Sequence, residues 1–301
     1  MLSEQECAEH LAYTDWDRYK IAKDVLNAYI KQAPFTNQLY HDERVRRMEQ
    51  KLKDLKIYLA PEALKKAQAQ YRQAIQKAPS DWRLRWKYGK LLAEDLKDYR
   101  AAAEQYRLFL EHIPHSYTGC TALGQVLVKL GDIDGAIAQY REAIRIKSGK
   151  PIPHYFLAQV YRKQGRTDKA IEYYSKTLQI LPTHVDAYFN LGLTYQTQGR
   201  LDKAIEQYSE ALRLRPNHAK AHNNLAISLY QQSKLKEAVQ TYRRGLLVVP
   251  DDLKLHYNLA ILLEKQGHKN EAIKELRAAL QIDPNSIEVR KMLEDMLKRG
   301  Y

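Results

Sequence analysis

The chain has 301 residues, a formal net charge of +13 and 45% hydrophobic residues, a composition typical of a folded and basic protein. No apolar run approaches the ~18 residues of a membrane-spanning helix, and the N-terminus lacks the basic start and apolar core of a secretory signal. The two cysteines, Cys7 and Cys120, lie far apart and are expected to be free thiols, which favours a reducing, cytoplasmic compartment.

The positive charge is expected to be spread over a solvated surface, because no run of five like charges occurs and most basic residues have an acidic neighbour. A more specific interpretation is that the positive charge binds an acidic partner, and a protein or peptide is favoured over nucleic acid.

Residues 1–81 show an irregular helical pattern. The stretch DRYKIAKDVLNAYIKQAP, residues 17–34, has helical spacing, residues 42–59 are rich in Arg and Lys and predict a longer helix, and residues 62–78 predict another that ends before Pro79. Proline ends such helices because it cannot continue them. We predict an N-terminal cap or adaptor made of degenerate repeats.

A period of 34 residues follows. Pro182, Pro216, Pro250 and Pro284 each stand 34 residues after the one before, and fixed-period similarity is the signature of a repeat architecture. The unit 82–116 has 35 residues, one more than the period, and the extra residue is predicted in the turn near Leu96–Asp98. The predicted units are 82–116, 117–150, 151–184, 185–218, 219–252 and 253–286, and residues 287–301 are a predicted C-terminal capping helix.

Each unit predicts two short helices. In 185–218, Tyr188, Leu191, Gly192 and Tyr195 share one helix face at i, i+3, i+4 and i+7, and Gly199 ends that helix. A second apolar stripe then runs to Pro216. Helices of ~12–15 residues are marginal alone, so the units must stabilise one another by packing.

The unit resembles a tetratricopeptide repeat, whose hallmark positions here hold Tyr188, Leu191, Gly192, Tyr195, Ala204, Tyr208, Ala211 and Pro216. The resemblance implies an all-α solenoid, a right-handed superhelix of helix-turn-helix units. It also implies that the first helices of successive units line a concave groove that binds an extended peptide or partner segment.

The groove positions implied by the resemblance include an asparagine repeated at one period, at Asn190, Asn224 and Asn258, with Asn223 beside it. A side-chain amide offers a donor and an acceptor, so this ladder is expected to hold a peptide backbone whatever its sequence. The alternative is that asparagine is simply common at this position of the family. The remaining predicted groove residues are Tyr155, Phe156, Phe189, Lys220, Tyr230, Lys254, Tyr257 and Lys265.

Exposed aromatic residues in a concavity commonly anchor partners, and the three lysines would favour an acidic ligand. Relatives that bind the acidic tails of chaperones carry a five-residue clamp. Here Asn190 and Lys220 fill two clamp positions, whereas Tyr155, Gln159 and Asn224 occupy the other three. The clamp is therefore incomplete.

Histidines and acidic residues do not predict a metal site or an active site. His154, His222 and His256 occupy equivalent positions of different units, where neighbouring helices lie ~8–10 Å apart, too far for ligands that must converge within ~2 Å. No nucleophile elbow, phosphate-binding glycine loop or HExxH motif occurs. We expect no catalytic residues, no metal and no cofactor.

Residues 1–79 also resemble the segment that joins an SGNH-type hydrolase domain to C-terminal tetratricopeptide repeats in some bacterial proteins, although none of the catalytic motifs is present. The leading hypothesis is therefore a non-catalytic protein-interaction scaffold. The alternatives are the substrate-recruiting region of such a hydrolase, periplasmic if the chain is a fragment of it, and weak binding of nucleic acid through the net positive charge.

Overall fold

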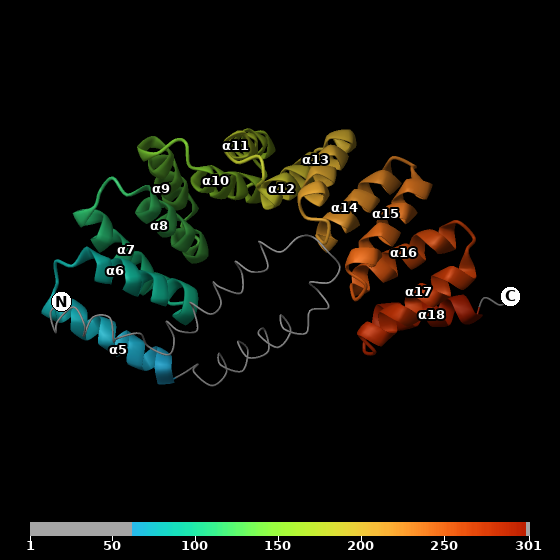
Figure 1. The fold of residues 1–301 in the computed structure, drawn as a ribbon, viewed down its shortest axis with the longest axis horizontal. Coiled ribbons are helices and arrows are strands. Elements are labelled where there is room, and N and C mark those ends of the chain that lie inside the picture. The colour runs from blue at the N-terminus through green and yellow to red at the C-terminus, as the bar shows by residue number, and fades with distance from the viewer. Residues whose placement is uncertain (1–61, 299–301) are drawn as a thin grey trace, which may run out of the picture. The chain divides into compact units, whose positions relative to one another are not determined.

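The computed structural model describes residues 62–298, and every regular element in this range is a helix. Within residues 62–146, and again within residues 151–298, each helix packs against the next along the chain (Figure 1). The predicted all-α solenoid of helical repeats is confirmed. The helices are α5 (Glu62–Lys77), α6 (Trp82–Lys90), η1 (Leu91–Leu96), α7 (Tyr99–His112), α8 (Tyr117–Leu130), α9 (Ile133–Ile146), α10 (Pro151–Lys163), α11 (Thr167–Ile180), α12 (Val185–Thr197), α13 (Leu201–Leu214), α14 (Ala219–Gln231), α15 (Leu235–Val248), α16 (Leu253–Lys265), α17 (Lys269–Ile282) and α18 (Ile287–Lys298).

Residues 1–61 and 299–301 lie outside the described range. They include most of the predicted adaptor at 1–81, the predicted helix at 42–59, Cys7 and the last residues of the predicted cap at 287–301. The chain divides into two compact units, Met1–Ile146 and Lys147–Tyr301, whose described parts hold α5–α9 and α10–α18.

In the first unit, the extra residue of the repeat 82–116 lies inside its first helix. The six residues of η1 form a π-helical turn directly after α6, and a π-turn is the ordinary way to insert one residue into an α-helix. Lys97, in the left-handed conformation with φ 57°, then ends the helix. The prediction that the turn near Leu96–Asp98 absorbs this residue was wrong, because a helix can widen locally without losing its backbone hydrogen bonds.

In the second unit, the repeated alanines and tyrosines form the core. Tyr174 and Tyr208 are fully buried and Tyr242 is nearly so. The periodic alanines on the same helices are fully buried too, because a methyl group is all that fits where two helices meet. Gly192 on α12 lies against Tyr208 on α13, and a Cβ atom at Gly192 would be only 2.7 Å from the tyrosine ring. This contact fixes the distance between the two helices of one repeat.

Candidate functional site

The predicted groove residues of the second unit all lie on the first helix of a repeat, namely on α10, α12, α14 and α16. Each of these helices contacts the first helix of the next repeat, so their side chains can form one continuous surface, which we call the first-helix face. Asn190 is buried, whereas Lys220, Tyr230, Lys254 and Lys265 are exposed. The half-buried members are Tyr155, Phe156, Phe189, Asn223, Asn224, Tyr257 and Asn258.

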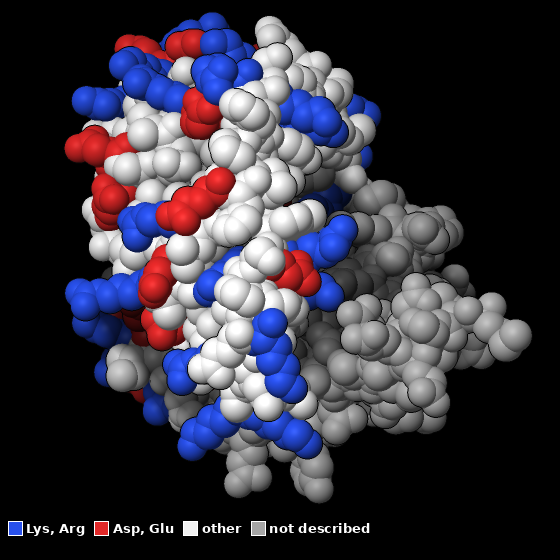
Figure 2. Space-filling view, turned by 90° about the vertical axis from the view of Figure 1, so that its left-hand side faces the viewer, with Lys and Arg blue, Asp and Glu red and all other residues white. Residues whose placement is uncertain are grey.

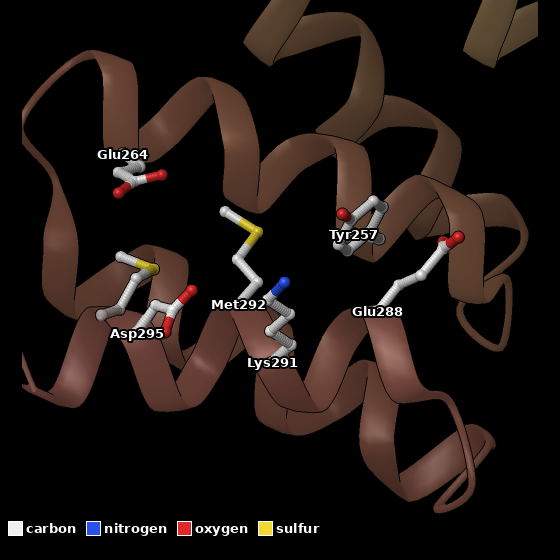
Figure 3. A pocket seen from close by; sticks show the side chains of 7 residues that line it. Tyr257, Glu264, Glu288, Lys291, Met292 and Asp295 are labelled. Atoms are coloured by element: carbon white, nitrogen blue, oxygen red, sulfur yellow. The ribbon is translucent and has the colours of Figure 1, made fainter.

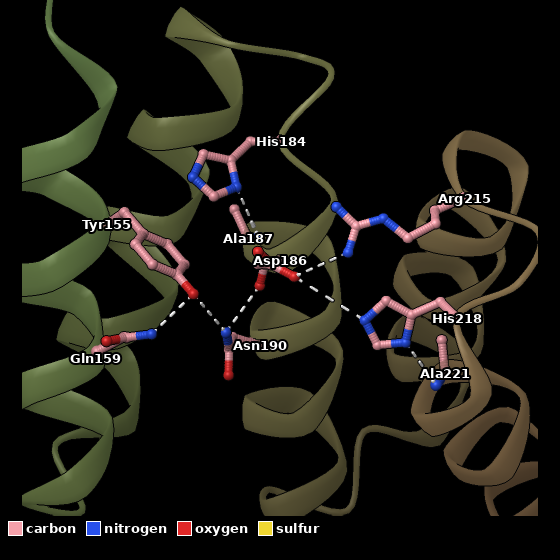
Figure 4. Close-up of polar contacts among 9 residues, drawn as sticks. All are labelled: Tyr155, Gln159, His184, Asp186, Ala187, Asn190, Arg215, His218 and Ala221. Atoms are coloured by element: carbon pink, nitrogen blue, oxygen red, sulfur yellow. Dashed lines mark hydrogen bonds and ion pairs between the residues drawn. The ribbon is translucent and has the colours of Figure 1, made fainter. Parts of the chain in front are cut away.

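Asn190 joins two neighbouring repeats. Its Nδ2 atom donates hydrogen bonds to the Tyr155 hydroxyl on α10, at 3.1 Å, and to the backbone oxygen of Asp186, at 2.8 Å (Figure 4). Gln159 donates a second hydrogen bond to the same hydroxyl. Among the described residues, the amide oxygen of Asn190 accepts no hydrogen bond, and in Figure 4 it points away from the other side chains drawn. The donor side of this amide therefore serves the fold, and its acceptor side is unused among the described residues.

A second polar cluster joins α14 and α16. Asn258 donates to the amide oxygen of Asn223 at 2.7 Å, and Asn223 donates to the amide oxygen of Asn224 at 3.1 Å. Asn224 also lies against the hydroxyl of Tyr208, and Asn258 against that of Tyr242. The structure thus brings three of the four predicted asparagines together and leaves Asn190 in a separate cluster with Tyr155.

The aromatic members of the face are more covered than the sequence indicated. The Tyr155 ring stacks on His184, with centroids 4.6 Å apart, and the Phe189 ring stacks on His218 at 4.8 Å. Phe189 also packs on Tyr208, and Tyr257 packs against the core of the unit. Each ring therefore has one face in the fold and contributes only part of its surface to any ligand.

His184 and His218 are residues of the site that the sequence analysis did not select. Each is the N-cap of a first helix, and its Nδ1 accepts a backbone hydrogen bond, from Ala187 at 3.2 Å and from Ala221 at 3.1 Å. Burial lowers the pKa of both imidazoles, which favours the neutral ring whose nitrogen can accept. Histidine is not a preferred N-cap residue, so the only signal in the sequence was its recurrence one period apart, directly before each helix.

Asp186 carries the charge of this region. Its carboxylate lies 3.6 Å from the Arg215 guanidinium and 4.0 Å from the His218 ring (Figure 4). It also raises the pKa of the Tyr155 hydroxyl, in addition to the larger effect of burial, so that this hydroxyl stays protonated. The Tyr155 hydroxyl can therefore donate its proton.

At the other end of the face, Lys265 lies over the ring of Tyr230. The ammonium is 4.8 Å from the ring centroid and donates a hydrogen bond to the tyrosine hydroxyl. This contact links α16 to α14 through exposed side chains, whereas Lys220 and Lys254 are exposed without such a ring contact.

The three histidines at the fourth position of their repeats have a common structural role. The Nε2 atoms of His154, His222 and His256 each lie 2.8–2.9 Å from the backbone oxygen six residues earlier in the chain. They therefore fix the loop that enters each repeat. Among residues 62–298, no group of three or more histidine, cysteine, aspartate or glutamate side chains is arranged to hold a metal ion.

A concentration of positive charge lies on α5 and α6, which the sequence analysis treated as part of an evenly spread excess. Residues 62–90 contain eight basic and two acidic residues. Figure 2 views the first unit from the left-hand side of Figure 1. Lys and Arg are interspersed with Asp and Glu over the upper part of this view, and they predominate in its lower part. A charge count in a window of one helix pair would have found the cluster. Its exposed basic side chains are Lys65, Lys66, Arg72, Lys77, Arg83, Lys87 and Lys90.

None of the helices in the described range combines the length and apolar character needed to cross a bilayer.

Comparison with known proteins agrees with this architecture. The family model described as the C-terminal domain of cilia and flagella-associated protein 70, a tetratricopeptide repeat model, matches residues 97–300, and a general tetratricopeptide repeat model matches residues 62–116. No curated protein sequence matches the chain.

Solved structures share the fold at low sequence identity. The C-terminal part of a tetratricopeptide repeat protein from Cytophaga hutchinsonii is 18% identical with a TM-score of 0.63, and the match covers 76% of this chain and 94% of that one. YrrB, described as a tetratricopeptide repeat protein with an unusual peptide-binding site, is 18% identical with a TM-score of 0.52, covering 64% and 99%. MamA is 21% identical with a TM-score of 0.51, covering 56% and 91%.

Proposed function

The chain belongs to the tetratricopeptide repeat proteins, in the family described as the C-terminal domain of cilia and flagella-associated protein 70, and we propose that it is a non-catalytic scaffold that binds an extended peptide along the first-helix face. The observation that carries this proposal is the set of polar groups on α10–α16 whose hydrogen-bonding capacity the fold uses only in part. YrrB, which shares the fold, is described as having a peptide-binding site.

The asparagines act as oriented acceptors in this proposal. The hydrogen bonds from Asn190 to Tyr155 and from Asn258 to Asn223 fix the two amide planes. Among the described residues, the amide oxygens of Asn190 and Asn258 accept no hydrogen bond of their own. Preorganised polar groups bind with a smaller entropic cost than mobile ones, and an amide oxygen is the partner that a peptide N–H requires.

Tyr155 complements Asn190. Its hydroxyl donates to a peptide carbonyl while the neighbouring Asn190 oxygen accepts from a peptide N–H. Together the two side chains match the donor and the acceptor of a peptide backbone, which explains recognition that does not depend on the ligand's side chains.

The exposed lysines select the charge of the ligand. Lys220 and Lys254 are exposed on the first helices of consecutive repeats, where they favour an acidic peptide. Because these charges are exposed, their effect on affinity falls as salt rises.

The test uses a peptide selected from a random ten-residue library on the wild-type protein, with its affinity measured by fluorescence anisotropy. The variant with Asn190→Ala, Asn224→Ala and Asn258→Ala is expected to bind about 10-fold or more weakly, because each lost hydrogen bond contributes ~1 kcal/mol. The matched control replaces Asn217, Asn270 and Asn285, which lie outside the first-helix face, and should keep the wild-type affinity.

A second variant separates binding from folding, because the three asparagines also join helices. Lys220→Glu with Lys254→Glu changes only exposed side chains, and should weaken an acidic peptide while the circular dichroism spectrum and the melting temperature stay unchanged. Wild-type affinity in both the asparagine and the lysine variants would contradict the proposed site. Salt-dependent binding of random oligonucleotides that competes with the peptide would point to a nucleic-acid ligand instead.

A further inference from the structure

A cavity of about 360 Å³ lies between α16 and α18, beside the predicted groove residue Tyr257 (Figure 3). Its size is at the lower end of the ~300–1,000 Å³ typical of small ligand sites, which suits a single long side chain. Its walls come from two helices that are not consecutive in the chain. The lining residues are Tyr257, Glu264, Glu288, Lys291, Met292, Asp295 and Met296.

One part of the lining is aromatic and apolar. Tyr257 and Met292 are half-buried, and Met296 is buried. In Figure 3 the Met292 side chain extends from α18 toward α16, the helix that carries Tyr257. A tyrosine ring and a thioether together favour an alkyl stem that ends in a flat cation, because the ring face is negative and the sulfur is polarisable.

The other part of the lining is acidic. Three carboxylates and one ammonium line the cavity, a local excess of two negative charges in a chain whose net charge is +13. This contrasts with the exposed lysines of α14 and α16, Lys220, Lys254 and Lys265. The cavity therefore favours a positively charged group, whereas the exposed lysines favour a negatively charged one.

The charges of α18 are not neutralised within the fold. Lys291 stands three residues after Glu288 and four before Asp295, a spacing that permits ion pairs along a helix. At the same three-residue spacing, Glu142 pairs with Arg145 at 2.6 Å and Glu210 with Arg213 at 2.9 Å. Among the described residues, however, neither Glu288 nor Asp295 forms an ion pair. Asp295 is also half-buried, where an unpaired carboxylate is costly and gains most from an incoming cation.

We propose that this cavity binds an arginine side chain of the peptide ligand. The inference rests on the proposed function and deepens it, because it gives the ligand an arginine beyond its acidic segment. The guanidinium stacks on Tyr257 and donates paired hydrogen bonds to Glu288, which lies at the same end of the cavity (Figure 3). Its alkyl stem covers Met292, and the carboxylate of Asp295, two turns away on the same helix, adds electrostatic attraction. Lysine fits less well, because its ammonium is a compact and strongly hydrated point charge.

The four methionines of the chain make the cavity directly observable. They are Met1, Met48, Met292 and Met296, so two of the four methyl signals in a methionine-labelled NMR spectrum report on the cavity. The probe is N-acetyl-arginine N-methylamide, titrated into the full chain, and the signals are assigned with Met292→Leu and Met296→Leu. We expect saturable shifts of the Met292 and Met296 methyl groups only, and weaker shifts with the lysine analogue.

Variants on the same helix supply the controls. Glu288→Gln with Asp295→Asn should weaken binding of the arginine probe about 10-fold, and Lys291→Gln should strengthen it, because the ammonium repels the guanidinium. Glu294→Gln changes an exposed carboxylate on α18 that does not line the cavity, and should leave the affinity unchanged.

The proposal would be overturned if neither methionine signal shifted, or if the variant with Glu288→Gln and Asp295→Asn bound the arginine probe as tightly as the wild type does. The assignment to arginine would be overturned if the lysine analogue bound as tightly as the arginine probe. The asparagine variant of the first-helix face should still bind the arginine probe. Wild-type peptide affinity in the asparagine and lysine variants, together with an intact arginine response, would therefore contradict the proposed function alone. Weakened peptide binding in those variants without any arginine response would contradict only the arginine site.

Discussion

At the scale of single residues, the polar side chains of the first-helix face have two roles. The hydroxyls of Tyr208 and Tyr242, which are deeply buried, donate hydrogen bonds to Gln196 at 2.8 Å and to Asn223 at 3.5 Å. Asn190 and Asn258 donate hydrogen bonds to Tyr155 and Asn223 of the preceding repeat, so the asparagine period has a structural reason. The same amides still keep capacity for a ligand, and the structural and the functional interpretations of the asparagines are therefore compatible.

At Ser233 a residue with a side chain stands where four other repeats have a glycine. It has φ 62° in the turn after α14, where the other turns have glycine at 131, 165, 199 and 267 with similar angles. A left-handed conformation costs a residue with a side chain ~1–2 kcal/mol, and glycine avoids most of this cost. We predict that Ser233→Gly raises the free energy of unfolding by ~0.5–1 kcal/mol, measured as a higher urea midpoint.

The reciprocal change is the matched control for Ser233. Gly199→Ser places a side chain at the same position of another repeat, where a Cβ atom meets no neighbouring atom within 4 Å. It should lower the urea midpoint by a comparable amount through backbone strain alone. A lower midpoint for Ser233→Gly would show that the serine side chain stabilises the turn in a way that offsets its conformation.

At the scale of helices, two kinds of contact hold the repeats together. Within a repeat, a small residue on the first helix lets the second helix approach. Between repeats, a glutamine at the end of one first helix reaches back to the preceding repeat, as Gln198 does to Thr167 and Asp168, and Gln232 to Asp202. The first kind sets the spacing of a helix pair, and the second aligns one pair with the next.

Gly192→Ala tests the spacing within a repeat. Alanine is normally the better helix residue by up to ~1 kcal/mol, but its Cβ would lie 2.7 Å from the ring of Tyr208, which is fully buried and cannot move aside. Because overpacking costs ~1–3 kcal/mol, we predict a net loss of ~1–2 kcal/mol in the free energy of unfolding, measured by urea denaturation.

Gly149→Ala is the control for this prediction, since a Cβ atom at Gly149 meets nothing within 4 Å. It should leave the urea midpoint nearly unchanged. A Gly192→Ala variant as stable as the wild type would mean that α12 and α13 can separate without loss, and would contradict the interpretation of Gly192 as the residue that sets their distance.

At the scale of the whole molecule, contacts are local. The chain divides into two compact units at Ile146 and Lys147, and within each unit the described helices pack mainly on their neighbours along the chain, as in other repeat proteins. All predicted groove residues, from Tyr155 to Lys265, belong to the second unit, together with the cavity between α16 and α18. The proposed peptide site therefore does not depend on the first unit.

A fragment of residues 147–301 tests this independence. It contains its own buried cluster around Tyr242, Leu259 and Leu276, so we predict that it folds with the helicity expected from α10–α18 and binds the selected peptide as the full chain does. Circular dichroism and fluorescence anisotropy are the measurements. An unfolded fragment, or a folded fragment without peptide affinity, would show that residues 1–146 contribute to the site.

The sequence by itself determined the class of fold and the residues that form its core. A 34-residue period in proline, alanine and tyrosine is local information, because each repeat is a helix pair whose apolar faces are set by spacing along the chain. Helix starts and ends follow from proline, glycine and capping residues in the same way. The π-turn at Leu91–Leu96 was missed because an inserted residue leaves no local signal of whether a helix or a turn absorbs it.

Only the tertiary structure decided which polar groups of the candidate site are already in use. The bond from Asn190 to Tyr155 spans 35 residues, as does that from Asn258 to Asn223. The stacking of His184 on Tyr155 and the cavity between α16 and α18 also depend on how neighbouring repeats pack. Spacing within a helix shows which face a residue occupies, but the distance between two helices depends on all the side chains between them. The first-helix face was therefore readable from the sequence, whereas its free acceptors and its acidic cavity were not.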